Sequence, residues 1–314
     1  MKLTIIIICY NHEQFIEECL KSVFNQKVNF QIEFIIADDV STDKSREIIS
    51  KFIINYSDRK INVLFRDKNL GLSQNYFTAV DQANGEYIAT ISGDDYWIDT
   101  EKIQKQVDFL ENNKTFSVCC THFKYFNSLK NEFIETILPV KHIYSHADIV
   151  KSVPVVAGTA MFRVSMLKLP LKARRLSVED WPMWWFLSLK GPIKFIPDIT
   201  LVYRKHHNNY YESRTWTAQR KLLLKLKYDL NNLTNSITPI TYLNQEKSKF
   251  IDVLISNLNK DEKLETLTIY CELCQYKNKY LLKMLRILPN FLFIILFKIS
   301  YRITFSKINE LNAK

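Results

Sequence analysis

The sequence of 314 residues predicts an α/β protein in which a doubly wound, mostly parallel sheet is followed by a helical region. Two observations support this prediction. In the first ninety residues, short apolar runs alternate with segments of helical periodicity, as in parallel sheets covered on both faces. From about residue 214 onward, helical patterns follow one another with no strand between them. We therefore predict two domains, residues 1–212 and 213–314.

Four short β-branched runs in the first part are predicted to be buried strands. They cover residues 4–9, 32–37, 61–65 and 87–92. Three segments with helical periodicity separate these runs. They are residues 13–24, a segment that Ser41 can cap, and residues 72–83. The middle segment has Ile48, Ile49, Phe52 and Ile53 on its inner face. Right-handed crossovers between such strands build a doubly wound sheet.

The alternation becomes less regular after residue 96. Helices are predicted over residues 100–111 and 178–189, and strands over residues 117–121, 157–163 and 199–203. Helical patterns then cover residues 216–233, 245–258 and 262–275.

The composition excludes several classes of protein. With 47% hydrophobic and 24% charged residues, and only 5 Gly and 8 Pro, the chain is globular rather than collagen-like or of low complexity. The net charge of +10 suits an anionic ligand, nucleic acid or an acidic membrane. Its basic residues form no recognisable RNA or DNA motif with stacking aromatics, so no nucleic-acid partner is expected. The lone CxxC of Cys271 and Cys274 lies in a helical pattern, and reduced thiols are expected.

The start of the chain indicates no secretory signal. The apolar run at residues 3–9 is too short for a signal core and is followed directly by polar residues. No stretch reaches the roughly 20 apolar residues that a membrane-spanning helix needs. We therefore expect a cytoplasmic protein.

Polar side chains follow each of the first four predicted strands, and the carboxyl ends of parallel strands meet at one edge of a sheet. The clearest signals there are two acidic pairs, Asp38-Asp39 and Asp94-Asp95. Adjacent carboxylates repel each other unless a cation neutralises them. Oxygen ligands suit Mg²⁺ or Mn²⁺, so Asp94-Asp95 predicts a divalent metal site. The alternative is that Asp94 or Asp95 caps the next helix.

Four ordered segments resemble the nucleotide-diphospho-sugar glycosyltransferases of family 2, which have the Rossmann-like GT-A fold. The segments are TIIIICYNHEQFIEECLKSVFNQ, IIADDVSTDKS, DKNLGLSQNYFTA and ISGDDYW. The resemblance covers roughly the first 110 residues, with weaker segments to about residue 212. It implies a hexosyltransferase-like, inverting enzyme that uses Mn²⁺ or Mg²⁺ and moves a sugar from a UDP- or GDP-sugar to an acceptor hydroxyl.

The resemblance also implies roles in binding the donor nucleotide. Asp39 would accept a hydrogen bond from the base, and Tyr10 would form a wall against it. Asn69 and Asn75 would line the nucleotide pocket, and Asp94 would contact the ribose. Val40, where the family often has Gly or Cys, departs from the pattern at a turn.

The same resemblance assigns the reaction chemistry. Asp95 would bind the metal that holds the diphosphate, and His206 would lie near the diphosphate or metal. Asp180 would be the base that deprotonates the acceptor hydroxyl, with Glu179 as its neighbour. Two alternatives are open: Glu179 and Asp180 form an acidic helix N-terminus, and His206 is a surface residue.

The C-terminal region has its own charge pattern. Between Leu273 and Asn309 there is no Asp or Glu, whereas seven Lys and Arg residues are interleaved with apolar ones. This pattern is typical of an interfacial membrane element and predicts peripheral attachment at the inner face of the cell membrane. The alternative is a helix whose Lys stems cover the α/β domain. With a saccharide or lipid-linked acceptor, the enzyme would serve the assembly of bacterial surface polysaccharide such as O-antigen or capsule.

Two rival functions are compatible with parts of this pattern. The first is a non-catalytic protein that binds a nucleotide or an anionic surface. The second is aspartyl phosphotransfer, which needs a nucleophilic Asp after the first strand, where this chain has Cys9, Tyr10 and Asn11. Neither rival predicts nucleoside diphosphate binding that depends on a divalent metal.

Overall fold

The computed structural model describes residues 1–134, 141–176, 178, 180–206 and 216–234. The chain forms two compact units, Met1–Ser213 and Arg214–Lys314. In the second unit the described part is helix α8 (Trp216–Leu233), which matches the helix predicted there. The predicted helices at residues 245–258 and 262–275 and the basic apolar segment lie outside the described residues. No helix in the described ranges has the length and apolar character needed to cross a bilayer.

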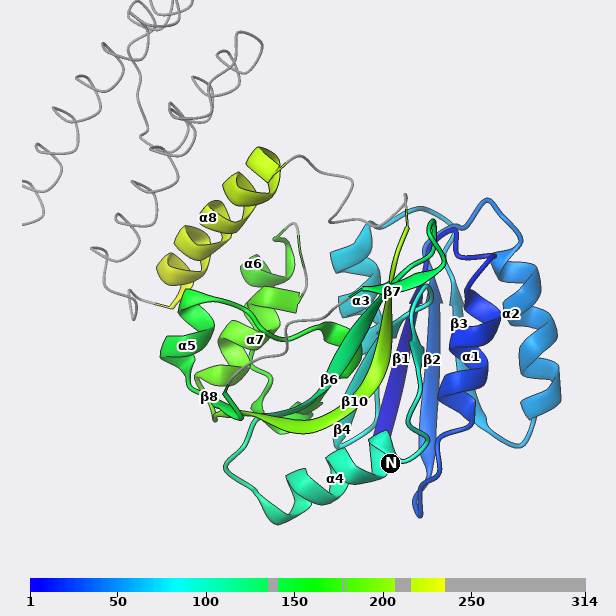
Figure 1. The fold of residues 1–314 in the computed structure, drawn as a ribbon, viewed down its shortest axis with the longest axis horizontal. Coiled ribbons are helices and arrows are strands. Elements are labelled where there is room, and N and C mark those ends of the chain that lie inside the picture. Colours follow the sequence, from blue (N-terminus) through cyan, green and yellow to red (C-terminus); the bar gives the residue numbers. More distant parts are fainter. Residues whose placement is uncertain (135–140, 177, 179, 207–215, 235–314) are drawn as a thin grey trace, which may run out of the picture. The chain divides into compact units, whose positions relative to one another are not determined.

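Four parallel strands form the first half of the sheet, in the order β3-β2-β1-β4 (Figure 1). They are β1 (Leu3–Cys9), β2 (Ile32–Asp38), β3 (Lys60–Phe65) and β4 (Tyr87–Ser92). The crossover helices are α1 (Ile16–Phe24), α2 (Ser45–Ile53) and α3 (Leu72–Val80). The predicted alternation of strands and helices is confirmed, and the carboxyl ends of the four strands lie at one edge.

The second half of the sheet contains β6 (Val118–Asn127), β9 (Ala160–Arg163) and β10 (Ile193–Lys205). Strand β9 runs antiparallel to both β4 and β6, and β10 is parallel to β6. Strands β4, β6 and β10 therefore point the same way, and the end of β10 lies at the same edge as the end of β4. The sheet is mixed but mostly parallel.

Short elements complete the unit. They are β5 (Tyr96–Trp97), β7 (Glu132–Ile134), β8 (Ile143–Tyr144), α4 (Lys102–Asn112), α5 (His146–Lys151), α6 (Leu171–Arg174) and α7 (Asp180–Ser188). The predictions missed all of these except α4 and α7, because two to six residues carry no measurable periodicity. The strand predicted at residues 157–163 begins only at Ala160, because Ala157–Thr159 forms a 3₁₀ turn.

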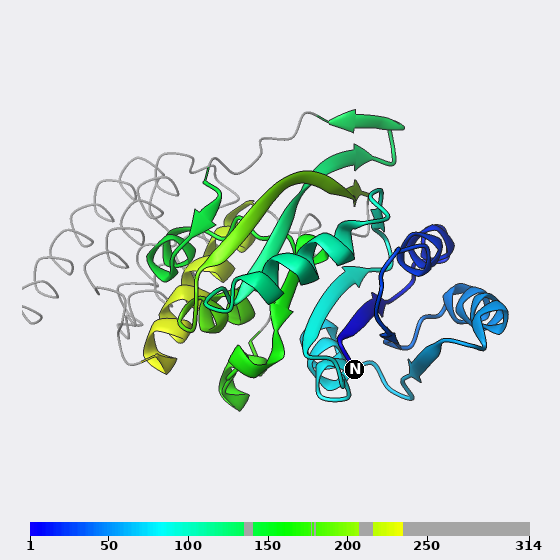
Figure 2. The ribbon, with the colours of Figure 1, turned by 90° about the horizontal axis from the view of Figure 1, so that it is seen from below.

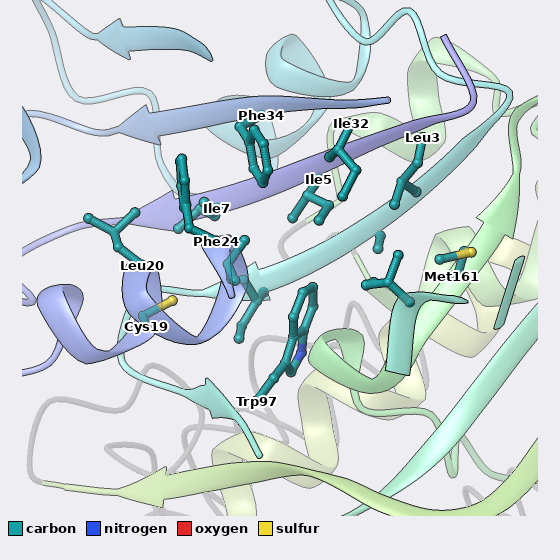
Figure 3. Close-up of a cluster of buried hydrophobic side chains, with 14 of the residues drawn as sticks. Leu3, Ile5, Ile7, Cys19, Leu20, Phe24, Ile32, Phe34, Trp97 and Met161 are labelled. Carbon is teal, nitrogen blue, oxygen red and sulfur yellow. The ribbon is translucent and has the colours of Figure 1, made fainter. Parts of the chain in front are cut away.

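The core lies between the sheet and helices on its two faces. Alternate residues of β1, including Leu3, Ile5 and Ile7, face α1 and α4. Figure 3 shows Leu20 and Phe24 of α1 beside Phe34 of β2, and the Phe24 and Phe34 rings stack with centroids 4.3 Å apart. Helix α3 contacts β1 and β2 from the other side (Figure 2). This double coverage is the reason that β1 and β2 are mostly apolar; two of their polar residues, Thr4 and Glu33, hydrogen-bond to each other.

Two local predictions are wrong. Strand β3 is not fully buried, because it is the edge strand of the sheet and its residues are half-buried or exposed. Ser41 does not cap a helix, because α2 begins only at Ser45. The Ser41 hydroxyl instead contacts the Asp38 carboxylate and accepts a hydrogen bond from the Asn11 amide at 2.9 Å.

The loops after β1 and β2 are joined by hydrogen bonds between side chains of one and backbone amides of the other. Asn11 Oδ1 accepts from Thr42 N at 2.8 Å, and Ser45 Oγ accepts from His12 N at 2.9 Å. Asn11 and Val40, one in each loop, have positive φ angles of 57° and 66°. Asn tolerates such a backbone, whereas a β-branched residue is strained there.

Replacing Val40 by Gly should therefore stabilise the fold by about 1 kcal/mol. Relief of about 1–2 kcal/mol of left-handed strain exceeds the roughly 0.5–1 kcal/mol that Gly costs through its larger loss of entropy on folding. Urea unfolding monitored by circular dichroism measures the change. The matched control is Asn131→Gly, also at positive φ (55°) but with a tolerant residue, which should change the stability less. A Val40→Gly variant no more stable than wild type would show that the turn carries no strain.

Candidate active site

The Asp94-Asp95 pair follows β4 and is held by the end of β10. Asp95 Oδ1 accepts a hydrogen bond from the Arg204 backbone amide at 2.9 Å, and the Asp94 carbonyl accepts one from Arg204 Nη1 at 2.8 Å. Both acidic residues are buried. The alternative that one of them caps a helix is excluded, because the next element is strand β5. These carboxylates are fixed in place at the sheet edge.

Two histidines approach the Asp94 carboxylate. His206 Nε2 lies 3.0 Å from Asp94 Oδ2, and His12 Nε2 lies 3.8 Å from the same oxygen. Burial alone would raise the pKa of Asp94, but His12 and His206 outweigh it and hold that pKa below its usual value. His12 is half-buried, and its loss of solvent lowers its own pKa despite the nearby Asp94 carboxylate. The two histidines therefore favour the charged form of Asp94.

Asp95 is in the opposite electrostatic situation. Burial, and then the neighbouring charge of Asp94, raise its pKa well above the usual value. A cation beside Asp95 would offset both effects. In the described ranges, no group of three His, Cys, Asp or Glu side chains forms a complete metal-binding set. Mg²⁺ and Mn²⁺ sites at phosphates commonly use one or two protein ligands and complete the coordination with substrate, and the Asp95 carboxylate could supply such a ligand.

Gly93 makes room for this arrangement. A Cβ atom there would lie 2.8 Å from Ile16 Cδ1 and 2.9 Å from His12 Nδ1. A side chain at position 93 would therefore require Ile16 and His12 to shift, and Gly93 leaves the space that His12 occupies beside Asp94. The sequence analysis assigned no role to His12, although it lies in the YNHE segment directly after β1.

Asp39 lies at the end of β2 and is buried. Its carboxylate accepts hydrogen bonds from the Leu70 and Gly71 amides at 2.7 and 2.8 Å. Asn69 Nδ2 donates to the Asp39 carbonyl at 2.9 Å. The 69–71 loop after β3 is therefore folded around Asp39, and the structure brings Asp39 and Asn69 together. Tyr10 follows β1 and is 48% exposed, so its ring is accessible to a ligand.

Asn75 holds its neighbours rather than facing solvent. It is fully buried, its Nδ2 donates to the Ala37 carbonyl at 3.0 Å, and its Oδ1 accepts from Arg66 Nε at 3.0 Å. Asp38 is similarly committed to the fold, because it contacts Ser41 and forms an ion pair with Arg46. Asp39 differs from Asp38 in that its carboxylate meets backbone amides of the 69–71 loop and not a charged side chain.

Asp180 is the first residue of α7, and its Oδ1 accepts a hydrogen bond from Trp181 N at 2.6 Å. Burial raises its pKa, and the Trp181 amide only partly opposes that shift. Glu179 lies outside the described residues. In the part of the chain that the structure describes, the hydrogen bonds joining Asp94, Asp95, Arg204 and His206 do not extend to Asp180.

Comparison with known proteins explains this arrangement. Residues 4–169 match the model of the glycosyl transferase family 2. The chain belongs to this family. The family 2 match begins in β1 and runs past β9, so it includes Asp39, Asp94 and Asp95.

The relatives agree with this assignment. An uncharacterized protein of Mycobacterium tuberculosis is 29% identical over 236 residues, which are 70% of this chain and 63% of that protein. The matched region thus spans less than two thirds of the mycobacterial relative. The putative teichuronic acid biosynthesis glycosyltransferase TuaG of Bacillus subtilis is 25% identical over 217 residues, covering 68% of this chain and 82% of TuaG.

Two solved structures share the fold. The chain superposes on S. aureus TarS 1–349 in complex with UDP-GlcNAc with a TM-score of 0.63 and 18% identity, over 88% of this chain and 81% of TarS. It superposes on the mannosyltransferase PcManGT of Pyrobaculum calidifontis, in complex with GDP-Man and Mn²⁺, with a TM-score of 0.54 and 14% identity, over 100% of this chain and 88% of PcManGT. The predicted GT-A fold of this family 2 protein is confirmed.

Proposed function

We propose that this family 2 protein transfers a sugar from a nucleotide-diphosphate-sugar donor to an acceptor hydroxyl, with inversion at the anomeric carbon. The observation that carries this proposal is the buried Asp94-Asp95 pair, held by Arg204 and His206 at the same sheet edge as Asp39. Ligands of open parallel sheets bind at this edge. The UDP-GlcNAc in TarS and the GDP-Man in PcManGT support a UDP- or GDP-sugar as donor.

The residues around the edge suit the parts of such a donor. Asp39, with Tyr10 and Asn69, would bind the base, and Asp94 would accept from the ribose. Asn75 would act indirectly, by holding the end of β2 through the Ala37 carbonyl. Asp95 and His206 would hold Mn²⁺ or Mg²⁺, a choice supported by the Mn²⁺ in PcManGT. When bound, such a cation offsets the charge that develops on the departing diphosphate.

Asp180 would take the proton from the acceptor hydroxyl as that oxygen attacks the anomeric carbon, and Glu179 would lie beside it. A base with a raised pKa is better matched to this task than an ordinary carboxylate, because it holds the proton more firmly. The bond from the acceptor oxygen to the anomeric carbon forms as the bond to the diphosphate oxygen breaks. Attack from the opposite side inverts the sugar, so no covalent enzyme intermediate is needed.

Thermal unfolding of the full chain with UDP and GDP, each with and without Mn²⁺ or Mg²⁺, tests the proposal. A ligand at about 100 times its Kd stabilises a protein by about 2.7 kcal/mol, so specific binding raises the melting temperature clearly. We expect stabilisation by one nucleoside diphosphate that requires the metal and is absent with the corresponding monophosphate. Stabilisation that is equal without metal would favour a non-catalytic nucleotide-binding protein.

Asp39→Ala should weaken the binding of the nucleoside diphosphate by about 10- to 100-fold, because a hydrogen bond to a charged group contributes about 1.5–3 kcal/mol. The Leu70 and Gly71 amides also lose their acceptor, so the loop around the base site should loosen. Titration calorimetry measures the affinity. The control is Asp38→Asn, which should lower stability through Ser41 and Arg46 but leave the affinity unchanged. Equal affinities in the Asp39→Ala variant and wild type would remove Asp39 from the site.

The acceptor is proposed to be a saccharide or lipid-linked precursor of a bacterial surface polysaccharide, a proposal supported by the similarity to TuaG, a putative glycosyltransferase of teichuronic acid biosynthesis. The basic, apolar sequence between Leu273 and Asn309 would attach the enzyme to the inner face of the cell membrane. Truncation after residue 275 should then abolish sedimentation with anionic vesicles at low salt and leave nucleotide binding intact. Full-length protein that does not sediment with such vesicles would contradict the attachment.

A further inference from the structure

Arg204 is an almost fully buried residue near the end of β10 for which the proposed chemistry has no role so far. Its side chain is aligned by two aromatic rings: its guanidinium carbon lies 4.3 Å from the ring centroid of Tyr96 in β5 and 5.2 Å from that of Phe15. An ion pair with Glu18 of α1 holds it from a third direction. The guanidinium is thus fixed by β5 and by the start of α1 before any ligand is bound.

The bonds of Arg204 converge on one peptide unit, the one that joins Asp94 to Asp95. The carbonyl oxygen of this unit accepts from Arg204 Nη1 at 2.8 Å, and its amide, Asp95 N, donates to the Ser92 carbonyl at 3.1 Å. The peptide plane is therefore held at both ends. The Arg204 backbone amide, in addition, donates to Asp95 Oδ1 at 2.9 Å. Arg204 of β10 thus restrains both the backbone and the carboxylate of Asp95 by hydrogen bonds.

We propose that Arg204 is a positioning residue that sets the direction of the Asp95 carboxylate toward the donor diphosphate and its cation. The inference rests on the proposed function, since it assigns Asp95 to that cation. A group that orients a metal-binding side chain raises the affinity for the metal, because the side chain then needs no reorganisation when the metal binds. Only a planar guanidinium can stack on Tyr96 and at the same time donate to the Asp94 carbonyl and Glu18; the point charge of Lys cannot.

Arg204→Lys is the test, measured by Mn²⁺ binding to the full chain in the presence of UDP or GDP. Electron paramagnetic resonance detects the free Mn²⁺. Replacing a residue that orients a metal ligand costs about 10- to 100-fold in metal affinity, and we expect a loss of that size. Arg163→Lys is the matched control, because Arg163 also lies over a tyrosine ring, 5.1 Å from Tyr87, and donates to a backbone carbonyl, that of Leu110. It should lose stability but keep the wild-type affinity for Mn²⁺.

The possible outcomes separate the two proposals. Wild-type protein that binds Mn²⁺ with nucleotide, together with an Arg204→Lys variant of the same affinity, overturns the role of Arg204 alone. Wild-type protein that binds no Mn²⁺ with either nucleotide overturns the proposed function and the inference with it. If Arg204→Lys does not fold, Tyr96→Leu replaces it: this variant removes one stacking surface and keeps the hydrogen bonds, and should weaken Mn²⁺ binding in the same direction. An unchanged affinity in that variant overturns the inference.

Discussion

Replacing Asp180 by Asn is expected to lower the rate of sugar transfer by about 10²–10⁴-fold, the usual contribution of a general base. Donor binding should remain close to that of wild type, because the base acts on the acceptor hydroxyl and not on the nucleotide. Initial rates with saturating donor, together with calorimetric titration of the nucleoside diphosphate, separate the two effects. Loss of donor binding to the same degree as activity would make Asp180 a structural or donor-facing residue.

The pH dependence gives an independent signature of the same residue. Only the deprotonated carboxylate can accept a proton, and burial raises the pKa of Asp180. The wild-type rate should therefore fall as the pH is lowered through a value above the ordinary Asp pKa of about 3.9. This acidic limb should be missing from the residual activity of Asp180→Asn. The matched control is Asp148→Asn, which removes a carboxylate from the first turn of α5 and should leave the rate unchanged.

Asp95→Asn should reduce transfer by several orders of magnitude, because the neutral amide lacks the charge that a hard divalent cation requires. Metal-dependent stabilisation by the nucleoside diphosphate should also disappear, and thermal shift with and without Mn²⁺ measures this. Near-normal turnover of the variant with Mn²⁺ would refute the metal assignment. A control is Asp99→Asn, which removes a carboxylate that binds Lys105 beyond β5 and should change neither property.

The same Asp95→Asn variant should be at least as stable as wild type without ligand. The folded-state pKa of Asp95 is raised, so above the unfolded-state pKa the folded protein holds a carboxylate that the fold disfavours. Asn removes this cost at neutral pH and can still accept the Arg204 amide hydrogen bond. Higher stability together with lost activity would show that the charge of Asp95 serves the function and lowers the stability of the folded protein. A large loss of stability would instead identify Asp95 as a structural residue.

The first half of the fold could be predicted because each strand there is a continuous apolar run and each helix has a clear face. Strand β4 was predicted at its observed bounds, and β1 differs by one residue. The second half depends on pairing between distant segments. Strand β9 has four residues, and its own sequence indicates neither its direction nor its position between β4 and β6. The periodicity of a short segment cannot identify a pairing strand that lies some forty residues away in the sequence.

The candidate site shows the same limit. The acidic pairs could be located, because each directly follows a predicted strand. The roles of their members were implied only by the resemblance to family 2. Asp38 and Asp39 differ in their partners in the fold, which are Arg46 in one case and the 69–71 loop in the other. The positions of Arg204 and His12 beside Asp94 depend on two further strands that converge at the same edge. Arg204 lies two residues before His206 in the sequence, but its target could not be predicted from that position.

The pairing of the loops after β1 and β2 restricts how this donor side can be altered. A residue inserted in either loop would move Ser41 away from the Asn11 amide, or Asn11 away from the Thr42 amide, and leave those groups without partners. The two loops therefore cannot change length independently. Attempts to redesign the base site by loop grafting would have to exchange both loops together, whereas point substitution at the exposed ring of Tyr10 leaves the connection between them intact.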